Sequence, residues 1–187
     1  LDTAFERGAY EKARKLAMER DDSRAMLMRA RLAEFDSDLK LAARFASTAR
    51  ERASSEAERA RATAMLANLK WQQGQWDAAE KLLRKYLSNH PKAHRVRVEL
   101  GRVLVSRGKS AEAEAVLDQL STYFNNGLME TSEELRLVGE GMQLLGSFDD
   151  ANFAFEKAYR KNEKNVDNLV DWGELFASKY NTSDAKK

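Results

Sequence analysis

The stretch "WQQGQWDAAEKLLRKYLSNHP" (71–91) spaces a glycine, an aromatic residue, a small residue and a proline as a helical hairpin would. Gly74 interrupts a run of helix-forming residues, and glycine ends a helix in the left-handed conformation at little cost. Ala79 and Leu83 then begin an apolar pattern at i and i+4, which is one face of a helix. Pro91 is the only proline of the chain. The stretch therefore predicts a tight turn at Gly74 and a second break at Pro91.

The same punctuation recurs along the chain. Gly74 and Gly108 are 34 residues apart, Gly108 and Gly146 are 38 apart, and Gly146 and Tyr180 are again 34 apart. Two further rows of small residues keep the spacings 34, 38 and 34, namely Ala79, Ala113, Ala151 and Ala185, and Ala67, Gly101, Gly139 and Gly173. Three rows that share one period and one exception indicate an internal repeat.

Each repeat is predicted to contain two helices. The small residue of the first helix allows the second helix to approach closely, and a turn at the conserved spacing reverses the chain. The second helices carry one apolar face each, formed by Ala79, Leu83 and Tyr86, by Ala113, Leu117 and Leu120, and by Ala151, Phe155 and Ala158.

This pattern resembles the tetratricopeptide repeat (TPR), which has the same period and the same order of small, aromatic and proline positions. The resemblance is carried by Leu66, Ala67, Gly74, Trp76, Ala79, Leu83, Pro91, Leu100, Gly101, Gly108, Ala113, Leu117, Gly139, Gly146, Phe148, Ala151, Phe155, Ala158, Trp172, Gly173 and Ala185. It implies an all-α, right-handed α-solenoid of antiparallel helix pairs. About five repeats are expected in one solenoid over 1–187, incomplete at both ends.

The repeat boundaries follow from the spacing. We expect a second helix of a partial repeat over 1–22, around Gly8, Tyr10 and Ala13, and a degenerate repeat over 23–59. Its small-residue positions are assigned to Ala30, Ala42, Ala46 and Ala49. Full repeats are expected over 60–93, 94–131 and 132–165, and a truncated repeat over 166–187. The open pattern at both ends suggests a fragment of a longer repeat protein.

The exception in the spacing is a four-residue insertion within "NNGLMETSEE" (125–134). Asn126 and Gly127 can end a helix, while Thr131 and Glu134 form the sequence of a capping box that begins the next one. We interpret the insertion as a neutral surface loop, because such loops tolerate added residues well.

Composition excludes several classes of function. The net charge is +2, which gives no footprint for binding nucleic acid. The chain has no cysteine and no apolar run of the roughly 20 residues that span a bilayer. A soluble, cytoplasmic protein is favoured, and the compartment stays open.

No catalytic, metal or cofactor site is predicted. His90 and His94 are four residues apart, but Pro91 places them across a loop rather than on one helix. "GEGMQL" (139–144) lies inside a predicted helix, so its glycines indicate packing rather than phosphate binding. "NTS" (181–183) is interpreted as a turn that caps a helix.

The resemblance also implies a concave groove lined by the first helices. One stripe of each first helix would face it, and the stripe changes from basic to acidic along the chain. The candidate partner-binding residues are Arg61, Asn68, Trp71, Arg95 and Arg102, and a secondary acidic set is Glu133, Glu140, Asp167 and Glu174. Arg24 and Arg31 precede the basic set. Trp76 and Trp172 are predicted to lie in the core.

The function implied is a non-catalytic protein-interaction scaffold that binds a protein or peptide. Arginines beside an amide and an aromatic ring suit an acidic peptide or a C-terminal carboxylate. Alternatively these charges pair between repeats, as Arg102 could with Glu133 or Glu140, for about 0–1 kcal/mol each. A second hypothesis is an accessory region of a larger enzyme, such as a hydrolase or peptidase, with its catalytic domain elsewhere. Self-association is a third.

Overall fold

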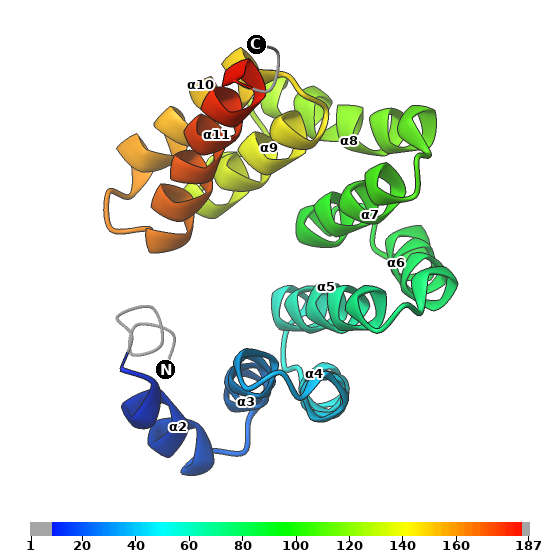
Figure 1. Cartoon of the computed structure of the whole chain (residues 1–187), viewed down its shortest axis with the longest axis vertical. Helices are drawn as coiled ribbons and strands as arrows, with labels where there is room; N and C mark the ends of the chain where they lie inside the picture. The colour runs from blue at the N-terminus through cyan, green and yellow to red at the C-terminus, as the bar shows by residue number, and fades with distance from the viewer. Residues whose placement is uncertain (1–8, 185–187) are drawn as a thin grey trace. The chain divides into compact units, whose positions relative to one another are not determined.

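The computed structural model describes residues 9–184, and it describes side chains as far as residue 179. This part of the chain forms ten helices and no strand, as the sequence predicted for an all-α solenoid (Figure 1). Gly8, expected in the partial first repeat, and Ala185, a member of one predicted row, lie outside it. None of the described helices is both long and apolar enough to cross a membrane. The chain divides into two compact units, the first ending at Glu99 and the second beginning at Leu100.

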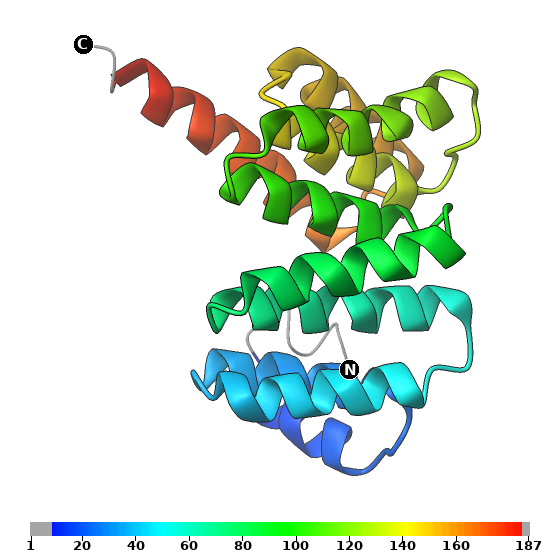
Figure 2. The same cartoon turned by 90° about the vertical axis from the view of Figure 1, so that its right-hand side faces the viewer.

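The first unit contains five helices and the beginning of a sixth. They are α2 (Tyr10–Met18), α3 (Ser23–Phe35), α4 (Leu39–Glu51), α5 (Glu56–Gln72), α6 (Trp76–Asn89) and the start of α7 (His94–Ser106). From α2 to α6 each helix packs on the next, and Figure 2 shows α3 and α4 side by side. The small residues assigned to the degenerate repeat, Ala30, Ala42, Ala46 and Ala49, are all fully buried. They let α3 and α4 pack closely without large side chains.

The second unit contains the rest of α7 and four further helices. These are α8 (Ser110–Asn125), α9 (Ser132–Leu144), α10 (Phe148–Lys161) and α11 (Val166–Asp184). Helix α9 lies against α8, α10 and α11. The predicted apolar faces of α8 and α10 are buried, and Leu117 and Phe155 at their centres have no exposed surface. Burial of these faces supplies most of the favourable free energy of the unit.

The predicted turn glycines have left-handed backbone conformations. The φ angles of Gly74, Gly108 and Gly146 are 75°, 71° and 76°. At the first of these turns the Gln75 amide donates a hydrogen bond to the Lys70 carbonyl at 2.9 Å, which satisfies a carbonyl at the end of α5. Gly127, with φ 67°, ends α8 in the same way, as predicted for the insertion.

The degenerate repeat makes this turn without glycine. Ser37 has φ 63° and is the only residue other than glycine with a positive φ among the described residues. The Asp38 amide donates to the Ala33 carbonyl at 2.8 Å, so the hydrogen bonding matches that at Gly74. This conformation costs a residue with a Cβ roughly 1–2 kcal/mol. The turn at Ser37 is therefore strained.

Close approach at the small residues is confirmed for two of the three glycines in the row. A Cβ placed on Gly101 would lie 2.6 Å from Leu117 Cδ2, and one on Gly139 would lie 2.5 Å from Phe155 Cε1. Gly173 differs, because a Cβ there would meet nothing within 4 Å. No atom of the described residues fills the space beside Gly173.

The capping box before α9 is also confirmed. Thr131 Oγ1 accepts a hydrogen bond from the Glu134 amide at 3.2 Å, and Glu134 Oε2 accepts one from the Thr131 amide at 3.0 Å. These two bonds satisfy backbone donors that the first turn of a helix leaves without partners. They fix the residue at which α9 begins after the four-residue insertion.

Four expectations were wrong or incomplete. Trp76 does not lie in the core: 55% of its surface is exposed, because it is the first residue of α6 and stands outside the interface that begins at Ala79. Trp172 is only half-buried, and its Nε1 donates to Asn152 Oδ1 at 2.8 Å. No turn occurs at Tyr180, since α11 continues to Asp184 and includes 181–183, which therefore cap no helix.

We predict opposite effects of alanine at the two glycines of the row. Gly139→Ala should lower the free energy of unfolding by about 1–3 kcal/mol, because the new methyl group would overlap the Phe155 ring. Gly173→Ala should raise it by about 0.5–1 kcal/mol, since this exposed helical position has room for a Cβ. Urea unfolding followed by circular dichroism measures both. Destabilisation by both variants would show that the side of α11 at Gly173 is covered.

We predict that Ser37→Gly stabilises the first unit by about 0.5–1 kcal/mol. Glycine relieves the strain of the left-handed conformation, and the larger conformational entropy that glycine gains on unfolding cancels part of this benefit. Gly74→Ser is the matched control. A Cβ at Gly74 would meet nothing within 4 Å, so Gly74→Ser adds backbone strain without a steric clash and should lower the free energy of unfolding. Thermal unfolding of the two variants beside the parent chain tests this pair. Shifts in the same direction would contradict the assignment of strain to the backbone.

Candidate partner-binding face

Polar contacts join successive first helices of the first unit on the side predicted to bind a partner. Arg24 Nε lies 3.3 Å from Glu58 Oε1, which joins α3 to α5. Gln72 Nε2 donates to Glu34 Oε1 at 2.6 Å and so joins the same helices again. Asn68 Nδ2 donates to Glu99 Oε1 at 3.2 Å and joins α5 to α7. We call these contacts the first-unit ladder.

The predicted partner-binding residues of the first unit lie in different environments. Arg61 is exposed and has no polar partner among the described residues. Trp71 is 37% exposed near the end of α5. Asn68 is already satisfied on both sides of its amide, because its Oδ1 also accepts from Gln72 Nε2 at 2.6 Å. Arg95 is half-buried on α7. Arg61 and Trp71 are therefore the two members most available to a partner.

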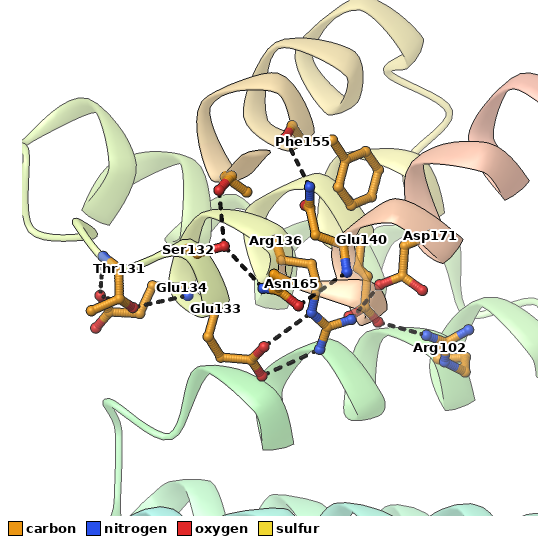
Figure 3. A network of polar contacts seen from close by, with 12 residues as sticks. Arg102, Thr131, Ser132, Glu133, Glu134, Arg136, Glu140, Phe155, Asn165 and Asp171 are labelled. Carbon is orange, nitrogen blue, oxygen red and sulfur yellow. Dashed lines mark hydrogen bonds and ion pairs between the residues drawn. The ribbon is translucent and has the colours of Figure 1, made fainter. Parts of the chain in front are cut away.

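A second network centres on Arg136 in the second unit. Its side chain is only 5% exposed, and its guanidinium contacts Glu133 Oε2 at 3.0 Å and Glu140 Oε1 at 2.6 Å. The same guanidinium is paired with Asp171 on α11. The second oxygen of Glu140 binds Arg102 Nη2 at 2.9 Å (Figure 3). We call these contacts the second-unit ladder, since they join α7, α9 and α11.

The pairing of Arg102 with Glu140 is one of the two outcomes that the sequence left open. In this structure the Arg102 guanidinium pairs with a neighbouring first helix rather than standing alone. Arg136, in contrast, belongs to the predicted stripe and was not selected as a site residue. Its position between Glu133 and Glu140 at i−3 and i+4 is the signal that could have identified it as the centre of an ion-pair network.

Burial and charge change the acid–base behaviour of this network. Burial alone would lower the pKa of Arg136, but Glu140, Glu133 and Asp171 outweigh it and hold that pKa above its ordinary value. Burial raises the pKa of Asp171; Arg136 opposes this effect, while the negative charges of Asp167 and Glu174 add to it. One buried guanidinium thus serves three carboxylates, and Asp171 is the least well neutralised of them.

Uncharged hydrogen bonds hold the helices that carry this network. Ser132 Oγ donates to the Ala158 carbonyl at 2.9 Å, and Asn165 Nδ2 donates to Ser132 Oγ at 2.9 Å (Figure 3). Asn168 is fully buried, and its Nδ2 donates to the Phe155 carbonyl at 3.1 Å. Because α9, α10 and α11 are tied together in this way, Asp171 and Arg136 are held in a fixed relation.

The predicted acidic set divides into two pairs. Glu133 and Glu140 are occupied by Arg136 and Arg102. Asp167 is half-buried and Glu174 is exposed on α11, and neither forms an ion pair with a described residue. With Asp171, five carboxylates face two arginines, so this side of the second unit keeps an excess of negative charge. Such a surface favours positively charged partners.

The described residues include no group of three or more His, Asp or Glu that could hold a metal ion. His90 and His94 are separated by the junction between α6 and α7, as predicted, and His90 Nδ1 lies 2.9 Å from Glu56 Oε1. Gly139 and Gly141 both lie within α9 and pack on Phe155 and Leu120. The chemistry that this face offers is recognition by charge, hydrogen bonding and aromatic contact.

Comparison with known proteins agrees with this architecture. Residues 64–121 match the tetratricopeptide repeat family. The fold is similar to that of a thermophilic TPR protein from Thermus thermophilus, with a TM-score of 0.61, 19% identity and 94% of each chain covered. It is also similar to a TPR protein from Parabacteroides merdae (TM-score 0.58, 16% identity, 94% of this chain and 66% of that one). PilF of Pseudomonas aeruginosa gives a TM-score of 0.51 at 18% identity, covering 97% of this chain and 82% of that one.

No curated protein is significantly similar in sequence to this chain. The helix pairs, the left-handed turns and the similar structures together define an all-α helical-repeat protein. Residues 64–121 match the tetratricopeptide repeat family, as the sequence pattern indicated, and the fold of the described chain is similar to that of TPR proteins.

We predict that Arg136→Met lowers the free energy of unfolding at pH 7 by about 3–5 kcal/mol, because it leaves Glu133, Glu140 and Asp171 without their shared cation. Burial raises the pKa of Asp171 even with Arg136 present, and removal of the guanidinium takes away the effect that opposes this rise. The lost stability should therefore return as the pH falls toward about 4 and disappear again as it rises. Urea titrations at pH 4 and pH 7 measure this, with Arg24→Met as the exposed control. An equal loss at both pH values would contradict the charge-based account.

Proposed function

We propose that this chain is a non-catalytic protein-interaction scaffold that binds a partner segment along the first-helix face of its first unit. The observation that carries the proposal is the contrast within that face. The first-unit ladder satisfies Asn68, Glu34 and Glu99 internally, while Arg61 and Trp71 stay available. A polar framework that is already ordered is suited to recognition, because binding has to order only the exposed cation and the exposed ring beside it.

The chemistry of Arg61 and Trp71 specifies the partner segment. A guanidinium binds carboxylates through paired hydrogen bonds, and an indole ring offers a large rigid contact surface. We therefore propose an extended segment with an acidic side chain or a free C-terminal carboxylate at Arg61, and an apolar or planar group at Trp71. Arg95 is assigned to the same surface. Arg102 is assigned to the second-unit ladder instead. We also propose that the repeats begin at residues 23, 60, 94, 132 and 166.

The proposal is tested by selecting binders from phage-displayed random dodecapeptides and measuring the best by isothermal titration calorimetry. Arg61→Glu should weaken their binding at least tenfold, and Trp71→Ala should also weaken it. Lys81→Glu is the matched control: it makes the same charge change at an exposed site on α6, and it should change affinity less than twofold. Selected peptides without acidic groups, or equal effects of the two reversals, would overturn the assignment.

A further inference from the structure

The four-residue insertion lengthens α8 at its C-terminal end. Helix α8 has 16 residues, whereas the second helices α6 and α10 have 14 each. Counted from the small residue Ala113 and its equivalents, Phe124 corresponds to His90 in α6 and to Asn162 in α10. Those two residues are the C-caps of their helices, but Phe124 is still helical. The insertion therefore adds a phenylalanine to the last turn of α8 that α6 and α10 lack.

Phe124 reaches α10 and packs there on a second phenylalanine. The rings of Phe124 and Phe153 meet edge-on, with their centroids 6.1 Å apart. Lys157 lies one turn after Phe153, and its Nζ is 4.6 Å from the Phe153 centroid and 4.9 Å from the Phe124 centroid. An ammonium group within about 6 Å of a ring centroid is attracted to the ring face. We call Phe124, Phe153 and Lys157 the aromatic clasp.

The clasp lies on a surface that also faces outward in the preceding repeats. By the repeat spacing Phe153 corresponds to Ala115 of α8 and to Lys81 of α6, and both of these residues are exposed. Phe153 itself is 48% exposed. A large aromatic ring thus occupies a position where α6 has a lysine and α8 an alanine. Contact with a second ring and a cation holds it there, which distinguishes it from an isolated apolar residue on a protein surface.

The positive charge of the clasp is not neutralised by the described residues. Lys157 forms no ion pair with any of them, and the neighbouring Glu156 is bound to Arg160 at 2.6 Å. Lys161, one turn further along α10, also forms no ion pair with a described residue. The exposed Asp150 lies in the first turn of the helix, so the outer side of α10 changes from acidic to basic along its length. A carboxylate is favoured beside Lys157 only.

We propose that the aromatic clasp is a binding site for a short partner segment that places a carboxylate on Lys157 Nζ and an aromatic side chain on the exposed side of Phe153. The two rings already hold the ammonium group, so less side-chain freedom is lost when a carboxylate binds to it. An aromatic side chain suits Phe153 because two rings attract each other beyond the area that they bury. An anionic lipid surface fits less well, since it would also meet Asp149 and Asp150 on the same helix.

This inference rests on the scaffold function and adds a second surface, in the second unit, to the first-helix face of the first unit. The insertion, expected from the sequence to be a neutral surface loop, supplies one of the two rings of the site. The site therefore belongs to one repeat boundary, between α8 and α10, and is not repeated along the chain.

The probe is the acetylated and amidated tetrapeptide EFEF, titrated into the whole chain labelled with carbon-13 in its phenylalanine rings. Nuclear magnetic resonance should show saturable shifts of the Phe124 and Phe153 ring signals. The tetrapeptides EAEA and KFKF, which lack the rings and the carboxylates respectively, should bind at least fivefold more weakly. Equal binding of EAEA or of KFKF would overturn the proposal, because the clasp would then not require both groups.

Two variants test the clasp with residues that other repeats carry at the same positions. Lys157→Gln introduces the residue found at Gln119 of α8, and Phe153→Lys the one found at Lys81 of α6. Each should weaken EFEF binding at least fivefold. Lys85→Gln is the matched control: it removes the same charge at the equivalent exposed position of α6 and should change the affinity less than twofold. Unchanged binding in Lys157→Gln would overturn the proposal.

Further outcomes separate this site from the alternatives. Lowered stability of Phe153→Lys in urea, without saturable shifts in the parent chain, would show that the clasp only joins two helices and would overturn the proposal. Binding to phosphatidylserine vesicles, or self-association, that Phe153→Lys abolishes in the absence of peptide binding would overturn it as well. Arg61→Glu should leave the EFEF shifts unchanged, so failure of the first-helix proposal and failure of this one give different results.

Discussion

Two helices of a pair can lie this close only because one of them lacks a side chain at the crossing. The Phe155 ring occupies the place that a Cβ of Gly139 would take, and Leu117 does the same at Gly101. Moving the helices apart by the width of a methyl group would uncover the second-helix residues on either side of Leu117 and Phe155, which are now fully buried. It would also lengthen the Asn168–Phe155 hydrogen bond that positions α11. The ion pairs of Arg136 in turn depend on that placement.

The fold could be predicted from the sequence because it rests on local rules. Glycine spacing located the turns, and the capping residues Thr131 and Glu134 located the start of α9, since both act through backbone hydrogen bonds within a few residues. These rules failed at repeat positions whose neighbouring residues differ from those that the repeat pattern implies. Trp76 was assigned to the core from its place in the repeat, yet a residue at the end of a helix has neighbours on one side only. Tyr180 lies at the spacing of the turn glycines, but it is not a glycine, and α11 continues through it.

The candidate site was less predictable, because charge pairing depends on which rotamers meet across helices. Helical periodicity predicted that Asn68 lies on the same stripe as Arg61, but it could not show that Gln72 and Glu99 saturate the Asn68 amide. Nor could it show that burial would concentrate three carboxylates on Arg136 and leave Arg102 at the edge of that group. Residues outside the stripe decide which members of it are available.

The two ladders also bear on how the chain reaches its folded state. The ladder contacts that join different helices link residues between 31 and 38 positions apart, so no long loop has to close before they form. Chains with such local contacts fold in roughly microseconds to milliseconds, and arrays of repeats can nucleate at more than one place. Each compact unit carries its own ladder and its own core. The first stable structure can therefore arise in either half of the chain and spread by adding one neighbouring helix at a time.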